Sequence, residues 1–218
     1  MMKYLKFFAV MCCLAALFTA CDWLEPKIEY SAVDLGLSVK WASTNVGAVY
    51  PEDFGDYYAW GETKSKSVYT YENYRWYEND GELLDIIKYN TKGENADNKT
   101  ILQKSDDVAN VKMGRFWRMP TANEAKELVE KCHWEVVTRG GVKGYRVTSL
   151  VNGNSIFLPM AGYADKNGEQ DENIRGFYWT TSLYTDPLKA YFFGFTKDDS
   201  YVNNIERRFG FSVRGVCE

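Results

Sequence analysis

The sequence predicts an α+β domain built from short antiparallel strands, one or two helices and long loops. The clearest helix signal lies at residues 121–132, where Thr121 and Glu124 have the spacing of a capping box. Further along the chain, short β-branched and aromatic runs alternate with turns rich in Gly and Asn, which is typical of hairpins. Aromatic residues make up 16% of the chain, which also favours β structure.

Residues on both sides of the capping box support this helix. Pro120 precedes it and holds Met119 in an extended conformation. Within the segment, apolar residues recur every three or four positions, as on one face of a helix. They are Ala125, Leu128, Val129 and Cys132. A shorter helical turn is expected within residues 105–109, where Asp and Ser side chains can cap it.

Short strands are expected before and after the helix. Residues 28–42 alternate enough to suggest two strands with a turn at Gly36. Residues 164–175 are interpreted as a polar loop. The other expected strands lie at residues 134–138, 145–149, 156–159, 176–182, 190–195 and 211–217.

The N-terminal residues are typical of a bacterial lipoprotein signal peptide. Lys3 and Lys6 precede an apolar run that is short for a membrane span, and small residues stand directly before Cys21. We therefore expect a signal peptide at residues 1–20 and acylation of Cys21. The alternative is an ordinary secretory signal that leaves Cys21 free.

Residues 21–29 would then be a tether, and residues 30–218 one domain with a variable insertion near 64–104. A lipid on Cys21 would hold the protein on a membrane of the cell envelope. We expect the outer membrane, and the sequence leaves the membrane face open. Without the signal peptide the net charge changes from −4 to about −6, which argues against a nucleic-acid partner.

Two cysteines remain in the expected mature chain besides Cys21. Cys132 and Cys217 form an even pair in an oxidising compartment, which predicts a disulfide from the end of the helix to the last residues of the chain. The alternative is a pair of buried free thiols.

Six ordered blocks resemble the Fibrobacter succinogenes major paralogous domain, a family that is abundant in lipoproteins of the Bacteroidetes group. The blocks are residues 33–42, 58–62, 117–121, 156–163, 178–182 and 212–216. The resemblance implies a C-type lectin-like fold whose terminal strands pair with each other, and a helix joined by a disulfide to the last strand. Residues 64–104 match least and are interpreted as an irregular, solvent-facing excursion.

The excursion contains the residues most typical of ligand binding. Exposed aromatic rings can stack on sugars or anchor a protein partner, and alternation with polar residues equally suits a strand that buries one face. Both interpretations remain open. The aromatic residues are Tyr69, Tyr71, Tyr74, Trp76 and Tyr77.

Calcium is considered because many lectins of this fold use it. Oxygen ligands of the kind that calcium prefers gather in the 164–175 loop. We take Asp165, Asn167, Asp171 and Glu172 as the candidate ligands. The sugar-binding Glu-Pro-Asn and Trp-Asn-Asp motifs are absent and the spacing is not that of an EF-hand. A solvated turn without a cofactor is therefore favoured.

Catalysis has little support in the sequence. His133 is the single histidine, and it adjoins Cys132, but neighbouring side chains generally point apart. The Arg-Met-Pro-Thr block is similar to a helix start in formylglycine-generating oxidases, which need reactive cysteines. We expect a non-enzymatic, lipid-anchored envelope domain that binds a glycan or a protein. The alternative is a structural or assembly subunit of a surface appendage or envelope complex.

Overall fold

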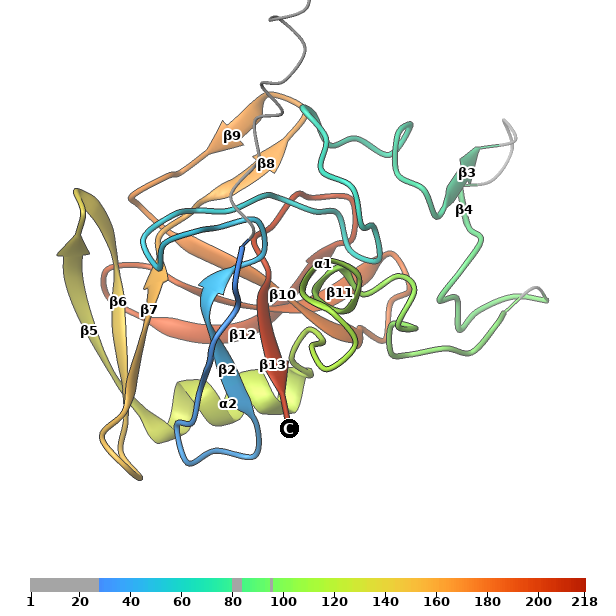
Figure 1. Ribbon diagram of the computed structural model, residues 1–218. Coiled ribbons are helices and arrows are strands. Elements are labelled where there is room, and N and C mark those ends of the chain that lie inside the picture. The colour runs from blue at the N-terminus through green and yellow to red at the C-terminus, as the bar shows by residue number, and fades with distance from the viewer. Residues whose placement is uncertain (1–27, 80–83, 95) are drawn as a thin grey trace, which may run out of the picture.

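The computed structural model describes residues 28–79, 84–94 and 96–218, and Figure 1 shows their arrangement. Small antiparallel sheets and two helices pack together, so the predicted α+β class is confirmed. The expected signal peptide, Cys21 and most of the expected tether lie outside the described residues. In the part that is described, neither helix has the length and hydrophobicity of a membrane span.

The first and last strands of the described chain meet in one sheet. Strand β2 (Lys40–Asn45) lies between β1 (Ala32–Val33) and β13 (Arg214–Cys217), and both neighbours run antiparallel to it. Trp41 of β2 lies opposite Val216 of β13 and its side chain is fully buried. The pairing of terminal strands that the family resemblance implied is therefore present.

The hairpins predicted after the helix are confirmed. Strands β5 (Cys132–Arg139), β6 (Val142–Ser149) and β7 (Ser155–Pro159) form an antiparallel sheet in that order. The turn between β5 and β6 consists of Gly140 and Gly141, whose φ angles are 57° and 86°. A two-residue hairpin turn of this kind needs positive φ at both positions, which glycine adopts without strain.

A second antiparallel sheet contains the most aromatic strands. Its order is β10 (Gly176–Leu183), β11 (Lys189–Phe195) and β12 (Ser200–Glu206). The first two lie where they were predicted, whereas β12 was not predicted. Asn203 and Asn204 interrupt its apolar pattern, and Asn is depleted in strands. Pairing with β11 along the whole of β12 forms the strand despite this composition.

Both helices begin where the sequence predicts. Helix α2 (Ala122–Lys131) has the capping box, in which the Thr121 hydroxyl accepts from the Glu124 N–H at 3.2 Å and the Glu124 carboxylate accepts from the Thr121 N–H at 2.7 Å. The helix lies against the β10–β12 sheet. The shorter α1 (Val108–Met113) is capped by Asp107.

Residues 64–104 differ from their prediction. They contain a small hairpin of β3 (Tyr77–Asn79) and β4 (Leu84–Ile86). Many of their apolar side chains nevertheless pack in the core, so the expected solvent-facing excursion is wrong for these residues. The buried residues are Tyr69, Tyr74, Trp76, Ile86, Tyr89 and Leu102.

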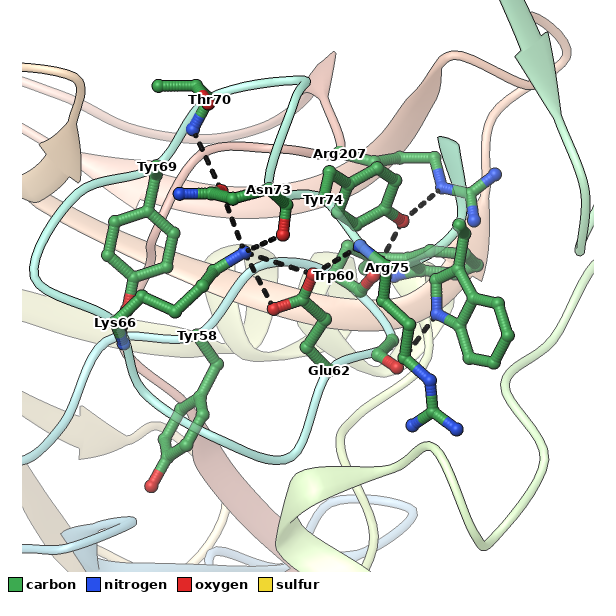
Figure 2. A network of polar contacts seen from close by, with 12 residues as sticks. Tyr58, Trp60, Glu62, Lys66, Tyr69, Thr70, Asn73, Tyr74, Arg75 and Arg207 are labelled. Carbon is green, nitrogen blue, oxygen red and sulfur yellow. Dashed lines mark hydrogen bonds and ion pairs between the residues drawn. The ribbon is translucent and has the colours of Figure 1, made fainter. Parts of the chain in front are cut away.

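Side chains hold the start of this segment by binding its backbone. Figure 2 shows the Glu62 carboxylate between the Lys66 ammonium, 2.8 Å away, and the backbone N–H of Arg75, also at 2.8 Å. Lys66 donates in turn to the backbone carbonyl of Asn73 at 3.0 Å. Buried backbone groups need partners, and here side chains supply them in place of a strand ladder.

A further hairpin occurs within the expected polar loop. Strands β8 (Tyr163–Asp165) and β9 (Gly168–Gln170) pair antiparallel. Asp165 Oδ1 accepts from the N–H of Asn167 at 2.7 Å, which is an Asx turn between the strands. Gly168 has a φ of 87°, which suits the tight reversal. The loop prediction is therefore wrong for this hairpin, because its turn chemistry was not recognised.

Buried apolar side chains of the described residues form two clusters. One joins residues 57–102 to the β10–β12 sheet and contains Trp60 and Trp179. The other joins α2 to the β5–β7 sheet and contains Leu128 and Leu158. Both clusters include side chains of β10 and β11, so the aromatic sheet lies between them.

Candidate ligand-binding site

The structure separates the five aromatic residues that were predicted to bind a ligand. Tyr69, Tyr74 and Trp76 are buried. Each donates a hydrogen bond of 2.6–2.9 Å to a backbone carbonyl within residues 57–61. Rings that are buried and bonded in this way have no face open to a ligand. The packing alternative is therefore right for these three residues.

The other two aromatic residues are half-buried beside a shallow depression. The rings of Tyr71 and Tyr77 are 4.8 Å apart, and the Arg208 guanidinium lies 5.1 Å from the Tyr71 ring centre. Arg208 is paired with Glu206 at 2.8 Å. Tyr71, Arg208 and Asp165 line this depression of about 270 Å³. It thus brings together one predicted aromatic residue and one predicted metal ligand, but neighbours already contact the Tyr71 ring.

The predicted calcium ligands Asp165, Asn167, Asp171 and Glu172 lie in and after the β8–β9 hairpin. Asp165 is used by the Asx turn, and Asp171 pairs with Arg175 at 3.4 Å. Among the described residues, no group of three or more His, Cys, Asp or Glu side chains is placed to hold a metal ion. Asp165 and Asn167 lie at the tight turn between β8 and β9.

The disulfide predicted between Cys132 and Cys217 is not formed, and both residues are free thiols. Cys132 follows the last residue of α2, whereas Cys217 shares a pocket with Thr121 at the start of that helix. A ten-residue helix is about 15 Å long, while the Cα atoms of a disulfide lie within about 7 Å. The prediction is corrected because the helix holds the two cysteines apart.

Cys132 and His133 do not form a nucleophile and base. They are successive residues of β5, and side chains alternate between the faces of a strand. Cys132 is buried in the core while His133 is exposed. Burial raises the pKa of the Cys132 thiol to about 11, so it is protonated at neutral pH and a poor nucleophile.

A pocket of about 440 Å³ lies beside the start of α2. Its walls come from residues 101–104, from α1 with the following residues 115–118, and from Cys217. We call it the Trp117 pocket. Its boundary includes the 117–121 block that carries part of the family resemblance.

One wall of the Trp117 pocket is aromatic. Phe116 is 73% exposed, the highest value among the large apolar residues that are exposed in the described part of the chain. The Arg115 guanidinium lies 4.6 Å from the centre of its ring. Trp117 is half-buried and rests on Gly215 of β13, where an added Cβ would lie 3.3 Å from the indole. The glycine lets the indole approach the strand, so the pocket wall is held by β13.

Asp107 fixes the other wall. Its Oδ1 accepts from the N–H groups of Ala109 and Asn110, at 2.9 and 3.2 Å, and its Oδ2 accepts from the N–H of Met119 at 2.8 Å. One carboxylate therefore caps α1 and ties it to the residues before α2. Burial raises the pKa of Asp107 to about 6 although these bonds and Arg118 favour its charged form.

Arg118 joins the start of α2 to the last strand. Its guanidinium binds both carboxylate oxygens of Glu124, at 2.6 and 2.8 Å, and these bonds raise the pKa of Arg118. Its backbone pairs with Val216, with bonds of 3.0 and 2.7 Å. Arg118 therefore holds the start of α2 against β13, and the capping box is part of the same polar group.

Two other cations at the pocket, unlike Arg118, are not held in an ion pair by a described residue. Lys104 and Arg115 line it, and within the described ranges neither forms an ion pair. Thr121 and Thr181 add hydroxyl groups to the lining. The site therefore offers an aromatic face, hydroxyls and two cations without an ion pair, beside the exposed carboxylate of Glu218. This arrangement suits a ligand with an apolar face and a negative group.

The sequence reasoning did not find Phe116, Lys104 or Arg115. The Trp117–Thr121 block was recognised as a helix start, and an aromatic residue next to it reads as core. Phe116 lies in the connection between α1 and α2, where its side chain is exposed. The signal available in the sequence was Arg115-Phe116-Trp117-Arg118, in which two neighbouring aromatic residues have an arginine on each side.

A family model described as a domain of unknown function, DUF8237, matches residues 55–216. The match contains both helices and all of the pocket lining except Cys217 and Glu218. Neither the curated proteins nor the solved structures contain a match to the chain. This protein therefore belongs to the DUF8237 family.

Proposed function

We propose that this protein is a lipid-anchored, non-enzymatic binding domain of the bacterial cell envelope, and that the Trp117 pocket holds a glycan or protein ligand. The observation that carries this proposal is the exposure of Phe116 beside Lys104 and Arg115, which form no ion pair with the residues that the structure describes. Aromatic rings beside polar groups are common where proteins bind sugars or other proteins.

The proposed anchor is a lipid on Cys21, and the proposed location is the outer membrane. The small residues before Cys21 and the basic, apolar segment that precedes them support acylation. Labelling cells with a traceable fatty acid tests this part. The label should appear on the wild-type chain and be lost from the Cys21→Ser variant.

We further propose that the α+β domain has a C-type lectin-like arrangement. The pairing of β2 with β13 supports it, because that fold joins its terminal strands. The six sequence blocks support it independently, and two of them, at residues 117–121 and 212–216, meet at the pocket through the pairing of Arg118 with Val216.

The absence of catalysis is also proposed. Cys132 and His133 were the two residues that a nucleophilic mechanism could use. They lie on opposite faces of β5, and the buried Cys132 thiol keeps its proton at neutral pH.

Binding to a glycan array tests the ligand. The full mature chain in detergent should bind glycans that carry a carboxylate or sulfate, because Lys104 and Arg115 line the pocket and neither forms an ion pair with another described residue. Phe116→Ala should lose most of this binding. Leu150→Ala is the matched control, since Leu150 is 71% exposed and lies in the turn after β6.

The array should be repeated with calcium and with a chelator. Binding that survives the chelator agrees with the Trp117 pocket, whereas calcium-dependent binding would assign the ligand to the Asp165 to Glu172 region. A blank array would contradict a glycan ligand. A photo-crosslinking residue at position 116 would then be used in cells, and the pocket proposal fails if position 116 captures no more protein than position 150.

A further inference from the structure

Strand β5 is the free edge of its sheet. It pairs with β6 on one side, and none of the described residues pairs with its other side. Figure 1 shows it at the outer side of the molecule. An edge strand of this kind offers unpaired backbone groups to another chain.

Two backbone hydrogen bonds next to the strands show which N–H and C=O groups of β5 face β6 and which face outward. The Leu150 N–H donates to the Lys131 carbonyl at 3.1 Å, and the Met160 N–H donates to the Lys143 carbonyl at 2.8 Å. In an antiparallel ladder only alternate residues face a given neighbour. Odd-numbered residues of β5 therefore face β6. Trp134, Val136 and Thr138 point their N–H and C=O groups outward.

The edge has no bulge, proline or lysine, three features that usually prevent pairing. Eight consecutive residues pair with β6 in one register without a bulge. The strand contains neither proline nor lysine, although both are common on protected edges. Val136 is 43% exposed on the same face of the strand as Trp134. This apolar side chain would be covered by a neighbouring strand.

We infer that β5 is a self-association edge, and that a second copy of this chain pairs with it antiparallel about a two-fold axis at Val137. Residues with outward groups must face each other in such a pair. With Val137 on the axis, Val136 lies opposite Thr138 of the second copy. Two strands that were edges then become the centre of a six-stranded sheet.

Charge complementarity selects this register. Glu135 lies opposite Arg139 of the second copy, and the symmetry makes this pair twice. Both are at positions without hydrogen bonds between the strands, where side chains are closest. An axis at Val136 would place Glu135 opposite Val137. An axis at Glu135 would place Lys131 opposite Arg139, which is a repulsive pair.

The existing partners of these charges are compatible with the dimer. Glu135 binds Arg146 at 2.5 Å and Arg139 binds Glu52 at 2.9 Å within one copy. The side chains of Glu135 and Arg139 are 47% and 52% exposed. Each can therefore accept a second, oppositely charged neighbour without leaving its first one.

Disulfide cross-linking of the full chain in the cell envelope tests the register. In Val137→Cys the two introduced thiols would meet on the axis, at a separation that suits a disulfide. Mild oxidation should give a dimer band well above wild type. Val151→Cys is the control, because Val151 is 62% exposed and lies in the turn between β6 and β7, outside the edge of β5.

Charge reversal separates the interface from effects within one copy. Glu135→Arg and Arg139→Glu, each combined with Val137→Cys, should each weaken cross-linking about tenfold. The double reversal should restore it. Restoration cannot arise within one copy, because the double variant places like charges at both Arg146 and Glu52.

Three outcomes would overturn the inference. They are a Val137→Cys dimer no stronger than the Val151→Cys control, a double reversal that does not recover, and cross-linking to a different protein in place of a second copy. Unchanged protease resistance of each variant would show that folding is retained. Phe116→Ala should leave cross-linking intact, so this test does not depend on the Trp117 pocket.

Discussion

Two regions of this domain each bury a whole arginine side chain, and they hold their backbone in different ways. Arg214 lies in the framework of regular strands, and Arg207 lies against the irregular residues 57–104. Neither has a carboxylate partner among the described residues. Both guanidinium groups bind backbone carbonyls instead.

Arg214 links strands that already have ladder partners. It donates to the Asn45 side chain at 2.8 Å, to the Ala42 carbonyl at 2.9 Å and to the Phe157 carbonyl at 3.0 Å. These acceptors belong to β2 and β7. Burial lowers the pKa of Arg214 to about 10. This arginine therefore joins two sheets, each of which is also held by its own hydrogen bonds.

Arg207 holds loops that have few ladder bonds. It donates to the Pro187 carbonyl at 2.9 Å, to the Lys88 carbonyl at 3.0 Å and to the Tyr74 hydroxyl at 2.8 Å. Its guanidinium also lies 4.7 Å from the Trp60 ring. Figure 2 shows Arg207 and Tyr74 beside the Glu62 network. In this region side chains replace the strand ladder.

The two regions should therefore differ in how they unfold locally. A strand that loses one arginine contact keeps its neighbours, whereas a loop held mainly by that arginine loses its attachment. Stability is not uniform across a protein, and regions with few backbone bonds open first. The 57–104 region should therefore open separately when Arg207 is lost, and the framework should not.

The largest effect is expected for Arg207→Met. The change leaves buried carbonyls without donors, so the free energy of unfolding should fall by about 3–5 kcal/mol. Hydrogen exchange should rise within residues 64–104 while β5–β7 remain protected. Measurement by mass spectrometry at low denaturant concentration resolves the two regions.

Arg214→Met is the matched comparison. Its loss in unfolding free energy should be similar, but exchange should rise across β2, β7 and β13 together because that region unfolds as a unit. The same local exchange pattern in both variants would contradict the difference between the regions.

A smaller effect concerns Asp107 and pH. Its native pKa of about 6 is above the unfolded value, so protonation favours the folded state. The stability that protonated Asp107 contributes is fully present below about pH 4 and is lost as pH rises through about 6. Relative to Asp107→Asn, the free energy of unfolding of the wild type should fall by up to about 3 kcal/mol between pH 4 and pH 7. Denaturant unfolding at pH 4, 5, 6 and 7 measures the difference, and a constant gap would contradict the burial effect.

The smallest expected effect is for Arg118→Ala. Its pair with Glu124 has good two-point geometry but is partly exposed, so its loss should lower the free energy of unfolding by about 1 kcal/mol. Thermal unfolding should show a modest decrease in Tm. Lys131→Ala is the control, since its pair with Glu127 is more exposed. An unchanged melting curve for Arg118→Ala would show that the capping box alone holds the start of α2.

Local signals in the sequence determined the regular elements. The Thr121 and Glu124 capping box, the Gly140–Gly141 turn and the aromatic strands all formed where they were predicted. Each of these elements depends on residues that are close together in the chain, so the local sequence pattern is enough to predict it. The α+β class follows from these elements.

Only the tertiary structure decided what the aromatic residues do. The sequence left binding and packing open for Tyr69, Tyr74 and Trp76. In the structure their rings are buried, and backbone carbonyls within residues 57–61 accept hydrogen bonds from their polar groups. Phe116 was given no role from the sequence, and it is exposed at the Trp117 pocket. Burial depends on which distant segments meet, and a local pattern does not record that.

The cysteines and the buried arginines show the same limit. Cys132 and Cys217 are an even pair in composition, yet α2 holds them at its opposite ends. Arg207 gave no signal in sequence, since its acceptors come from residues more than a hundred positions away or from a separate loop. The sequence by itself determined the helices, most strands and the fold class, because those arise from neighbouring residues. The tertiary structure decided the pocket, the free β5 edge and the role of each arginine, because these arise from contacts between segments far apart in the chain.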